Sequence, residues 1–171
     1  HGNTPPCTDL IIQSGIKHVV IGSLDPNALV NGSGINRLKS SGINVEVGPM
    51  QAECELLNKR FYTFHQKKRP YIILKWAQTA DGFIDKLRKN NEEGIHWITH
   101  PETKKITHQW RSEEAAIVIG TNTAINDNPN LTVRAASGTN PARIILDEDD
   151  KLPKNLSLFD GASRTIILSK K

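Results

Sequence analysis

Residues 17–48, KHVVIGSLDPNALVNGSGINRLKSSGINVEVG, decide the fold class. Residues 17–23 predict a buried strand, which is followed by a loop rich in Asp, Pro, Asn and Gly. Residues 35–42 predict a helix that ends at a glycine, and residues 43–48 alternate apolar and polar side chains as a strand does. A strand, a helix and a second strand in this order indicate a parallel sheet, so the sequence predicts an α/β fold.

Helical patterns flank this unit on both sides. Upstream, Pro5 and Pro6 hold the chain in a stiff turn, and a short helix that ends at Gly15 follows Cys7. Downstream, residues 50–67 predict one long helix. Its apolar side chains lie near one face, at Ala52, Leu56, Leu57, Phe61 and Phe64.

A change of composition at residues 67–70, KKRP, predicts a linker between two domains, 1–67 and 68–171. The second domain also alternates strands and helices. We expect strands at 71–78, 115–120, 142–147 and 164–169, a helix at 100–113 with Pro101 in its first turn, and a long polar loop at 121–134. The whole chain is therefore predicted to be α/β.

Composition and charge are those of an ordinary globular protein, with 37% hydrophobic and 23% charged residues among 171. The apolar runs are shorter than the roughly 18 residues that a membrane span needs, so no membrane association is expected. The 22 Lys and Arg residues are scattered, which argues against nucleic-acid binding despite the net charge of +4. The two distant cysteines form no disulfide framework, and this favours the cytoplasm. The start at His1 without a leader suggests a processed chain or part of a longer one.

Cys7 is the first candidate metal ligand, because zinc deaminases take ligands from a proline-cysteine turn such as Pro6-Cys7. No second cysteine lies close to it and no H-x-E motif precedes it. A buried structural thiol is therefore the alternative for Cys7. His1 is expected to be a solvated chain end, and Cys54 is expected in or beside the core.

Polar residues near the strand ends of the second domain are candidates for a ligand site. Lys75 interrupts an apolar strand, so it either faces a cleft or extends its amine to solvent. Asp81-Gly82 and Trp97 are weaker candidates, since a plain turn and a core tryptophan explain them better. The polar loop is the place where a phosphate and a ribose would bind; it carries Thr123, Asp127, Asn128, Leu131 and Arg134, the last suited to clamp an anion.

The order of these motifs carries a resemblance to a known family. HGNTPPCTDLIIQSGIKHVVIG with DPNALVNGSGINRLKSSGINVEV resembles the C-terminal part of the deaminase domain of the bifunctional riboflavin-biosynthesis deaminase/reductases. LNKRFYTFHQKKRPYIILKWAQTADG, HWIT and WRSEEAAIVIGTNTAINDNPNLTVR resemble the linker and the first half of the reductase domain. The resemblance implies the C-terminal part of a cytidine-deaminase-like three-layer domain, followed by part of a dihydrofolate-reductase-like α/β domain.

For the first domain the resemblance implies zinc-dependent hydrolytic deamination of a diaminopyrimidine ribosyl phosphate. Cys7 matches one of the three zinc ligands of the family, in its G-[KR]-T-P-P-C motif, with Asn3 in place of the usual Lys or Arg. The other two zinc ligands of the family and its catalytic Glu have no counterpart in this sequence. We therefore expect the chain by itself to be inactive.

For the second domain the resemblance implies NADPH-dependent reduction of the ribosyl side chain to ribityl. Lys75 and Asp127 match catalytic positions, and the cofactor contacts match Gln78, Trp97, Thr123 and Asp127. Arg111, Leu131 and Arg134 match substrate contacts. Ile95 and Glu148 stand where serine is common, and a carboxylate at 148 leaves the choice between NADPH and NADH open.

Further expectations follow from the same resemblance. The partners are a small pyrimidine ribosyl phosphate and other copies of the chain through the reductase domain, with neither nucleic acid nor a membrane. Three alternatives stay open: a stand-alone dihydrofolate-reductase-like oxidoreductase, a tRNA- or nucleotide-editing zinc deaminase, and a non-catalytic interaction module.

Overall fold

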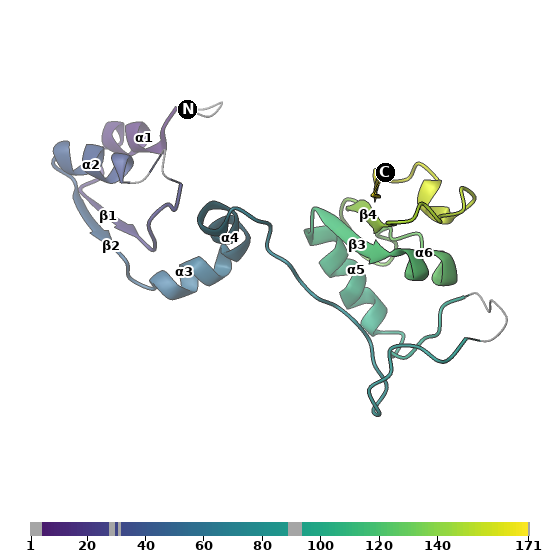
Figure 1. Ribbon diagram of the computed structural model, residues 1–171. Helices are drawn as coiled ribbons and strands as arrows, with labels where there is room; N and C mark the ends of the chain where they lie inside the picture. The colour runs from purple at the N-terminus through teal and green to yellow at the C-terminus, as the bar shows by residue number, and fades with distance from the viewer. Residues whose placement is uncertain (1–4, 28–29, 31, 89–93, 171) are drawn as a thin grey trace. The chain divides into compact units, whose positions relative to one another are not determined.

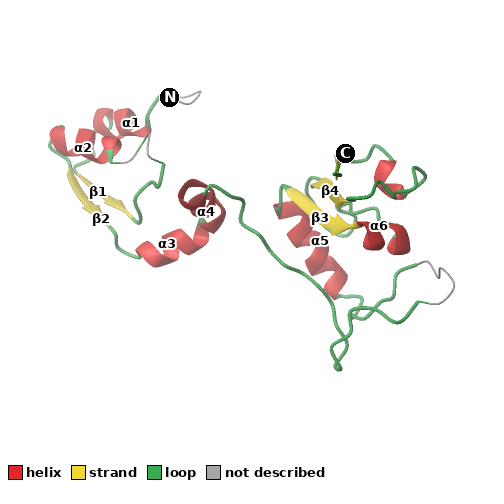
Figure 2. Cartoon of the chain, viewed as in Figure 1, coloured by secondary structure: helices red, strands yellow, loops and turns green. Residues whose placement is uncertain are grey.

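The computed structural model of the protein describes residues 5–27, 30, 32–88 and 94–170 (Figure 1). The chain divides into two compact units, His1–Leu74 and Lys75–Lys171. Each unit contains helices and a parallel sheet, so the mixed α/β class is confirmed (Figure 2). Among the described residues, none of the helices is both long enough and apolar enough to span a membrane.

The first unit is a two-stranded parallel sheet with helices before and after each strand. Its elements are α1 (Cys7–Gln13), β1 (His18–Ile21), α2 (Ser33–Ser40), β2 (Asn44–Val47), α3 (Gln51–Leu57) and α4 (Lys59–Lys67). Val19 lies opposite Val45 across the parallel pair, and α2 packs on β2. The strands and the helix predicted between residues 17 and 48 are therefore confirmed.

Two predictions for this unit are wrong in detail. The strand β1 is not buried, because Val19 and Ile21 are half-buried while Val20 is 58% exposed. The predicted single helix over 50–67 breaks at Asn58, whose Nδ2 donates to the Cys54 carbonyl at 3.1 Å. An Asn side chain that bonds the backbone in this way competes with helical hydrogen bonding.

The second unit is built on a three-stranded parallel sheet in the order β3-β4-β5. Its elements are α5 (Thr103–Glu113), β3 (Ala116–Gly120), α6 (Thr121–Asp127), β4 (Ala142–Leu146), the 3₁₀ helix η1 (Ser157–Phe159) and β5 (Thr165–Leu168). Ile145 of the central strand pairs with Ile119 on one side and Ile167 on the other. The predicted strands at 115–120, 142–147 and 164–169 are therefore confirmed.

The core of the second unit lies against the central strand β4. Its fully packed members are Ala124, Leu131, Ile145, Leu156 and Leu158. They come from α6, the segment after it, β4 and the segment around η1, so burial of a few aliphatic side chains ties four parts of the chain together.

The strand predicted at 71–78 is wrong. These residues form an extended segment without strand pairing, and Ile72, Leu74 and Trp76 are 62%, 79% and 61% exposed. The local pattern is that of a strand, but a strand forms only where another strand accepts its hydrogen bonds. In the described part of the chain, β3 pairs with β4 and no strand pairs with 71–78.

The polar segment after β3 and the start of α5 also differ from prediction. Residues 121–127 form the helix α6 rather than a loop, because Ala124 is completely buried in the core and holds a segment of weak helix propensity in place. The helix α5 begins at Thr103, and Pro101 lies in the turn before it rather than in its first helical turn.

Candidate functional site

A cavity of about 380 Å³ lies at the carboxyl ends of β3 and β4. In α/β sheets this edge is the usual place for ligands, because the strand ends and the loops that follow them leave a crevice. The helix α6 starts directly after the last residue of β3 and brings Thr121, Asn122 and Thr123 to the cavity. The other lining residues are Gly120, Leu146, Asp147, Glu148, Asp149 and Lys151.

Asp147 holds the two strand ends together beneath this cavity. Its side chain is 1% exposed and accepts hydrogen bonds from the Thr121 hydroxyl at 3.0 Å and from the backbone N–H groups of Lys151 and Leu152 at 3.1 Å each. Burial alone would raise the pKa of Asp147, but these donors outweigh it and hold the pKa below its usual value. Asp147 therefore anchors the turn after β4 to the start of α6.

The rim of this cavity carries paired charges. Glu148 forms an ion pair with Lys170, and Asp149 pairs with Lys151 at 2.7 Å between carboxylate oxygen and ammonium nitrogen. Glu148, which is expected at a cofactor-binding edge, thus has its carboxylate already paired with the Lys170 ammonium. Both pairs are exposed, so each contributes little to stability.

A second cavity of about 250 Å³ shares Asn122 and Thr123 with the first. Asp127 lines it and pairs with Arg88 at 2.9 Å, and Arg88 also pairs with Asp85 at 2.6 Å. Burial and the nearby Asp85 charge raise the pKa of Asp127, against the lowering effect of Arg88. Thr123 and Asp127, both predicted as cofactor contacts, line this cavity.

The prediction missed Asp85, Arg88 and His96, which line this cavity together with Ile84 and Asn126. The spacing of Asp85 and Arg88 is a detectable signal for a local ion pair. Nothing in the local pattern indicates that Arg88 also reaches Asp127, which lies 39 residues further along the chain.

A third polar group joins the predicted substrate residues Arg111 and Arg134. Arg111 Nη1 donates to the Thr132 carbonyl at 2.6 Å, and Arg134 Nη1 donates to the Thr132 hydroxyl at 3.1 Å. Burial, together with the charge of Arg134, lowers the pKa of Arg111. Among the described residues, neither guanidinium is ion-paired with a carboxylate. Two guanidinium groups that both donate to Thr132 and have no carboxylate partner make a suitable place for an anion.

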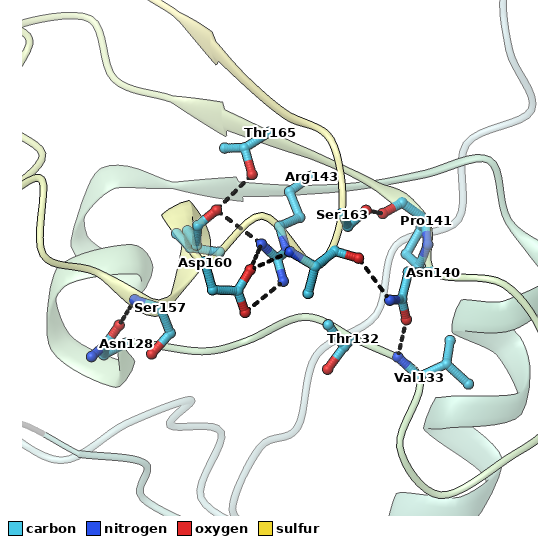
Figure 3. Close-up of polar contacts among 12 residues, drawn as sticks. Asn128, Thr132, Val133, Asn140, Pro141, Arg143, Ser157, Asp160, Ser163 and Thr165 are labelled. Carbon is cyan, nitrogen blue, oxygen red and sulfur yellow. Dashed lines mark hydrogen bonds and ion pairs between the residues drawn. The ribbon is translucent and has the colours of Figure 1, made fainter.

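A group of hydrogen bonds holds the segment around Thr132 and Val133 (Figure 3). Asn128 accepts from the Ser157 N–H at 2.7 Å. Asn140 accepts from the Val133 N–H at 2.8 Å and donates to the Ala162 carbonyl at 3.1 Å. The completely buried Arg143 pairs with Asp160 at 2.8 Å and so fixes the η1 region to which these bonds lead.

The remaining predicted residues of the second unit lie apart from these groups. Lys75 and Gln78 belong to the exposed segment 71–78, and neither lines either cavity. Trp97 is 60% exposed, with the Lys104 ammonium 5.6 Å from its ring centre. Leu131 is 7% exposed, and its side chain belongs to the core rather than to a ligand surface.

Cys7 is exposed and is the first residue of α1, so the alternative of a buried structural thiol is wrong. Residues 5–27, 30, 32–88 and 94–170 contain no group of three or more His, Cys, Asp or Glu side chains that could hold a metal. These residues by themselves therefore do not fit a zinc site. Cys54 is half-buried beside Gly22, and His1 and Asn3 lie outside the described residues.

Comparisons with known proteins find relatives that match nearly the whole chain. The family model of the RibD C-terminal domain matches residues 70–171. The riboflavin biosynthesis protein RibD of Aquifex aeolicus is 44% identical over 99% of this chain and 47% of its own length, and that of Actinobacillus pleuropneumoniae is 41% identical over 98% and 44%.

Solved structures show the same relation. The diaminohydroxyphosphoribosylaminopyrimidine deaminase/5-amino-6-(5-phosphoribosylamino)uracil reductase of Thermotoga maritima is 39% identical, with a TM-score of 0.85 over 100% of this chain and 48% of that protein. Acinetobacter baumannii RibD, form 1, is 30% identical, with a TM-score of 0.87 over 100% and 49%. The chain spans about half the length of the relatives it matches.

Proposed function

Because the chain belongs to the RibD family of riboflavin biosynthesis proteins, we propose that it carries parts of both a deaminase and a reductase of that pathway. In this proposal, residues 1–67 are the C-terminal part of a cytidine-deaminase-like domain. Residues 68–171 are the first half of a dihydrofolate-reductase-like domain. The Thermotoga maritima relative is named as both a deaminase and a reductase, which does not favour a stand-alone oxidoreductase, an editing deaminase or a non-catalytic module.

The observation that carries the reductase assignment is the pair Arg111 and Arg134. Both guanidinium groups converge on Thr132 without a carboxylate partner among the described residues. A phosphorylated ribose supplies the anion that such a pair requires, and bidentate guanidinium contacts would fix its orientation. Arg111 and Arg134 are thus proposed to bind the 5-phosphate of the ribosyl substrate, with the backbone at Leu131 beside it.

The two cavities beside α6 are the proposed place for the nicotinamide cofactor. Their position at the carboxyl ends of parallel strands and their polar lining suit a nucleotide. Thr123 lines both cavities and Asp127 lines the second, and both are proposed cofactor contacts together with Gln78 and Trp97. When bound, NADPH supplies the hydride that converts the ribosyl carbon to the ribityl form.

Lys75 and Asp127 are proposed to orient the reacting ribose and to support transfer of a proton to its ring oxygen. Asp127 is held by Arg88 at 2.9 Å, and its raised pKa suits a group that exchanges a proton. Lys75 lies in the exposed segment 71–78. The roles of both residues are expectations for the substrate-bound enzyme.

For the deaminase part, we propose Cys7 as the single zinc ligand that these residues supply. Its exposed place at the start of α1 leaves the thiol accessible to a metal. The described residues do not complete a zinc site by themselves. A small-molecule substrate, a cytoplasmic location and self-association through the reductase part complete the proposal.

The test is the effect of Arg134→Ala on reductase kinetics in the intact enzyme. A charge-assisted hydrogen bond contributes about 1.5–3 kcal/mol, so the KM for the ribosyl phosphate should rise about 10- to 100-fold. Arg164→Ala is the matched control, because Arg164 is an exposed arginine of the same unit outside both cavities. An unchanged KM in Arg134→Ala contradicts the phosphate role.

Lys75→Ala separates binding from chemistry. If Lys75 supports the proton transfer, kcat should fall about 100-fold, within the range of general acid–base catalysis, while KM changes little. An unchanged kcat would remove Lys75 from the mechanism and leave the phosphate assignment intact.

A further inference from the structure

We infer that His108 is a positioning residue that builds the proposed anion site, by holding the backbone of Arg134 beside Arg111. The inference rests on the proposed function for the identity of the anion, and on the hydrogen bonds of the described residues for the geometry. His108 was not among the residues singled out from the sequence. Its role is to act through Arg134 rather than to touch the substrate.

The side chain of His108 is 2% exposed and lies on α5. Its Nδ1 accepts the backbone N–H of Arg134 at 2.9 Å and that of Ala135 at 3.4 Å. An imidazole nitrogen that accepts these bonds carries no proton, so the hydrogen bonds assign the neutral ring with its proton on Nε2. A buried polar group with this many backbone bonds fixes the segment that it contacts.

Arg111 extends the same contact one helical turn further along α5. Residues at i and i+3 lie on one face of a helix, so Arg111 reaches the same loop as His108. Arg111 donates to the Thr132 carbonyl, and Arg134 donates to the Thr132 hydroxyl. His108 and Thr132 together bring two guanidinium groups of like charge near each other. The two charges repel each other, and a bound anion would offset this repulsion.

Contacts that do not involve His108 also hold this loop, one of them at Val133, directly before Arg134. Asn140 accepts the Val133 N–H and donates to the Ala162 carbonyl, both drawn in Figure 3 around Arg143 and Asp160. Gly138 packs so closely on Ser112 that an added Cβ would lie 2.6 Å from the serine Cβ. Because these contacts remain when His108 changes, loss of His108 should free the backbone at Arg134 without unfolding the loop.

The experiment compares His108→Asn with His108→Leu in the intact enzyme. The Oδ1 of asparagine can take the place of Nδ1 as acceptor, whereas leucine removes the acceptor and keeps an apolar side chain of similar size. Binding of ribose 5-phosphate is measured by calorimetry, and protection of the Arg134 amide by hydrogen exchange. Ile145→Val is the control for a modest loss of core packing in the same unit.

We expect His108→Leu to weaken ribose 5-phosphate binding about five- to tenfold, the effect of one hydrogen bond, and to raise KM with little change in kcat. His108→Asn should stay within about twofold of the native affinity, and Ile145→Val should not change it. The Arg134 amide should be protected in the native protein and in His108→Asn, and exchange faster in His108→Leu.

Equal affinity of His108→Leu and the native protein would overturn the inference, as would an Arg134 amide that exchanges rapidly in the native protein. The second measurement needs no variant, so it decides the matter even if His108→Leu does not fold. If the native protein protects the Arg134 amide but does not bind ribose 5-phosphate, the proposed anion fails while the contact of His108 with the loop stands.

Discussion

The two units of the chain hold their loops by different means. In the second unit, buried polar groups bind the backbone: Asp147 ties β4 to α6, Arg143 holds the η1 region, and His108 holds the segment at Arg134. In the first unit, the Tyr62 hydroxyl reaches back to the Ser23 hydroxyl and the Leu24 carbonyl, each at 2.7 Å. The two cavities lie in the unit whose loops are fixed by buried polar groups, and a ligand site needs side chains that keep their places.

The same contrast extends to apolar packing. The packed cluster around Ile145 belongs to the second unit, whereas the helices α3 and α4 of the first unit expose Leu56, Leu57 and Phe64. Four predictions test this comparison, from the largest expected effect to the smallest.

Ile145→Ala should lower the free energy of unfolding of the second unit by about 3 kcal/mol, because it leaves a cavity beside a completely buried side chain. Leu57→Ala, at a side chain that is 82% exposed, should change stability by less than about 0.5 kcal/mol. Urea unfolding followed by tryptophan fluorescence measures the first change, since Trp76, Trp97 and Trp110 all lie in the second unit. Equal losses in the two variants would remove the contrast in packing.

Gly22→Ala should destabilise the first unit by about 1–2 kcal/mol through overpacking. A Cβ at position 22 would lie 2.3 Å from the sulfur of Cys54. The double variant Gly22→Ala/Cys54→Ala removes this clash and should regain most of the loss. Hydrogen exchange of the β1 and β2 amides measures both variants, and no rescue by the second substitution would refute the clash.

Tyr62→Phe should cost the first unit about 1 kcal/mol, because the phenol hydroxyl bonds the Ser23–Leu24 segment. Tyr71→Phe is the matched control, since the described residues give the Tyr71 hydroxyl no hydrogen bond and only its ring contacts Lys59. Hydrogen exchange of the backbone amides at residues 22–25 measures this loss of stability. A similar effect of the two substitutions would mean that the hydroxyl of Tyr62 holds nothing in place.

The smallest effect should be a pH dependence of the second unit that arises from His108. Burial, together with the charges of Arg111, Arg134 and Lys104, lowers the pKa of His108 in the folded protein. The unfolded chain therefore binds a proton below about pH 6.5 that the folded protein resists, so stability falls as the pH drops through that range. His108→Asn should flatten this slope and the exposed His100→Asn should not, as urea unfolding at about pH 5 and pH 7 will measure.

Part of the site could be predicted because it follows from local order. Thr123 and Asp127 come after an apolar strand, and in a parallel sheet the residues after a strand reach its carboxyl edge. Arg111 and Arg134 were paired through family resemblance, and the structure brings both to Thr132. Arg88 and His108 were missed, because their partners lie 39 and 26 residues further along the chain and no local pattern marks them.

By itself, the sequence determined the class of the fold and most of its strands. The runs at 115–120, 142–147 and 164–169 are rich in Ile and Val, and such residues favour a pleated, half-buried surface wherever they occur together. Only the tertiary structure decided whether a run became a strand, since residues 71–78 have the same pattern and stay unpaired. It also decided that 121–127 is a helix. The physical reason is the same in both cases, because strand pairing and side-chain burial depend on distant parts of the chain.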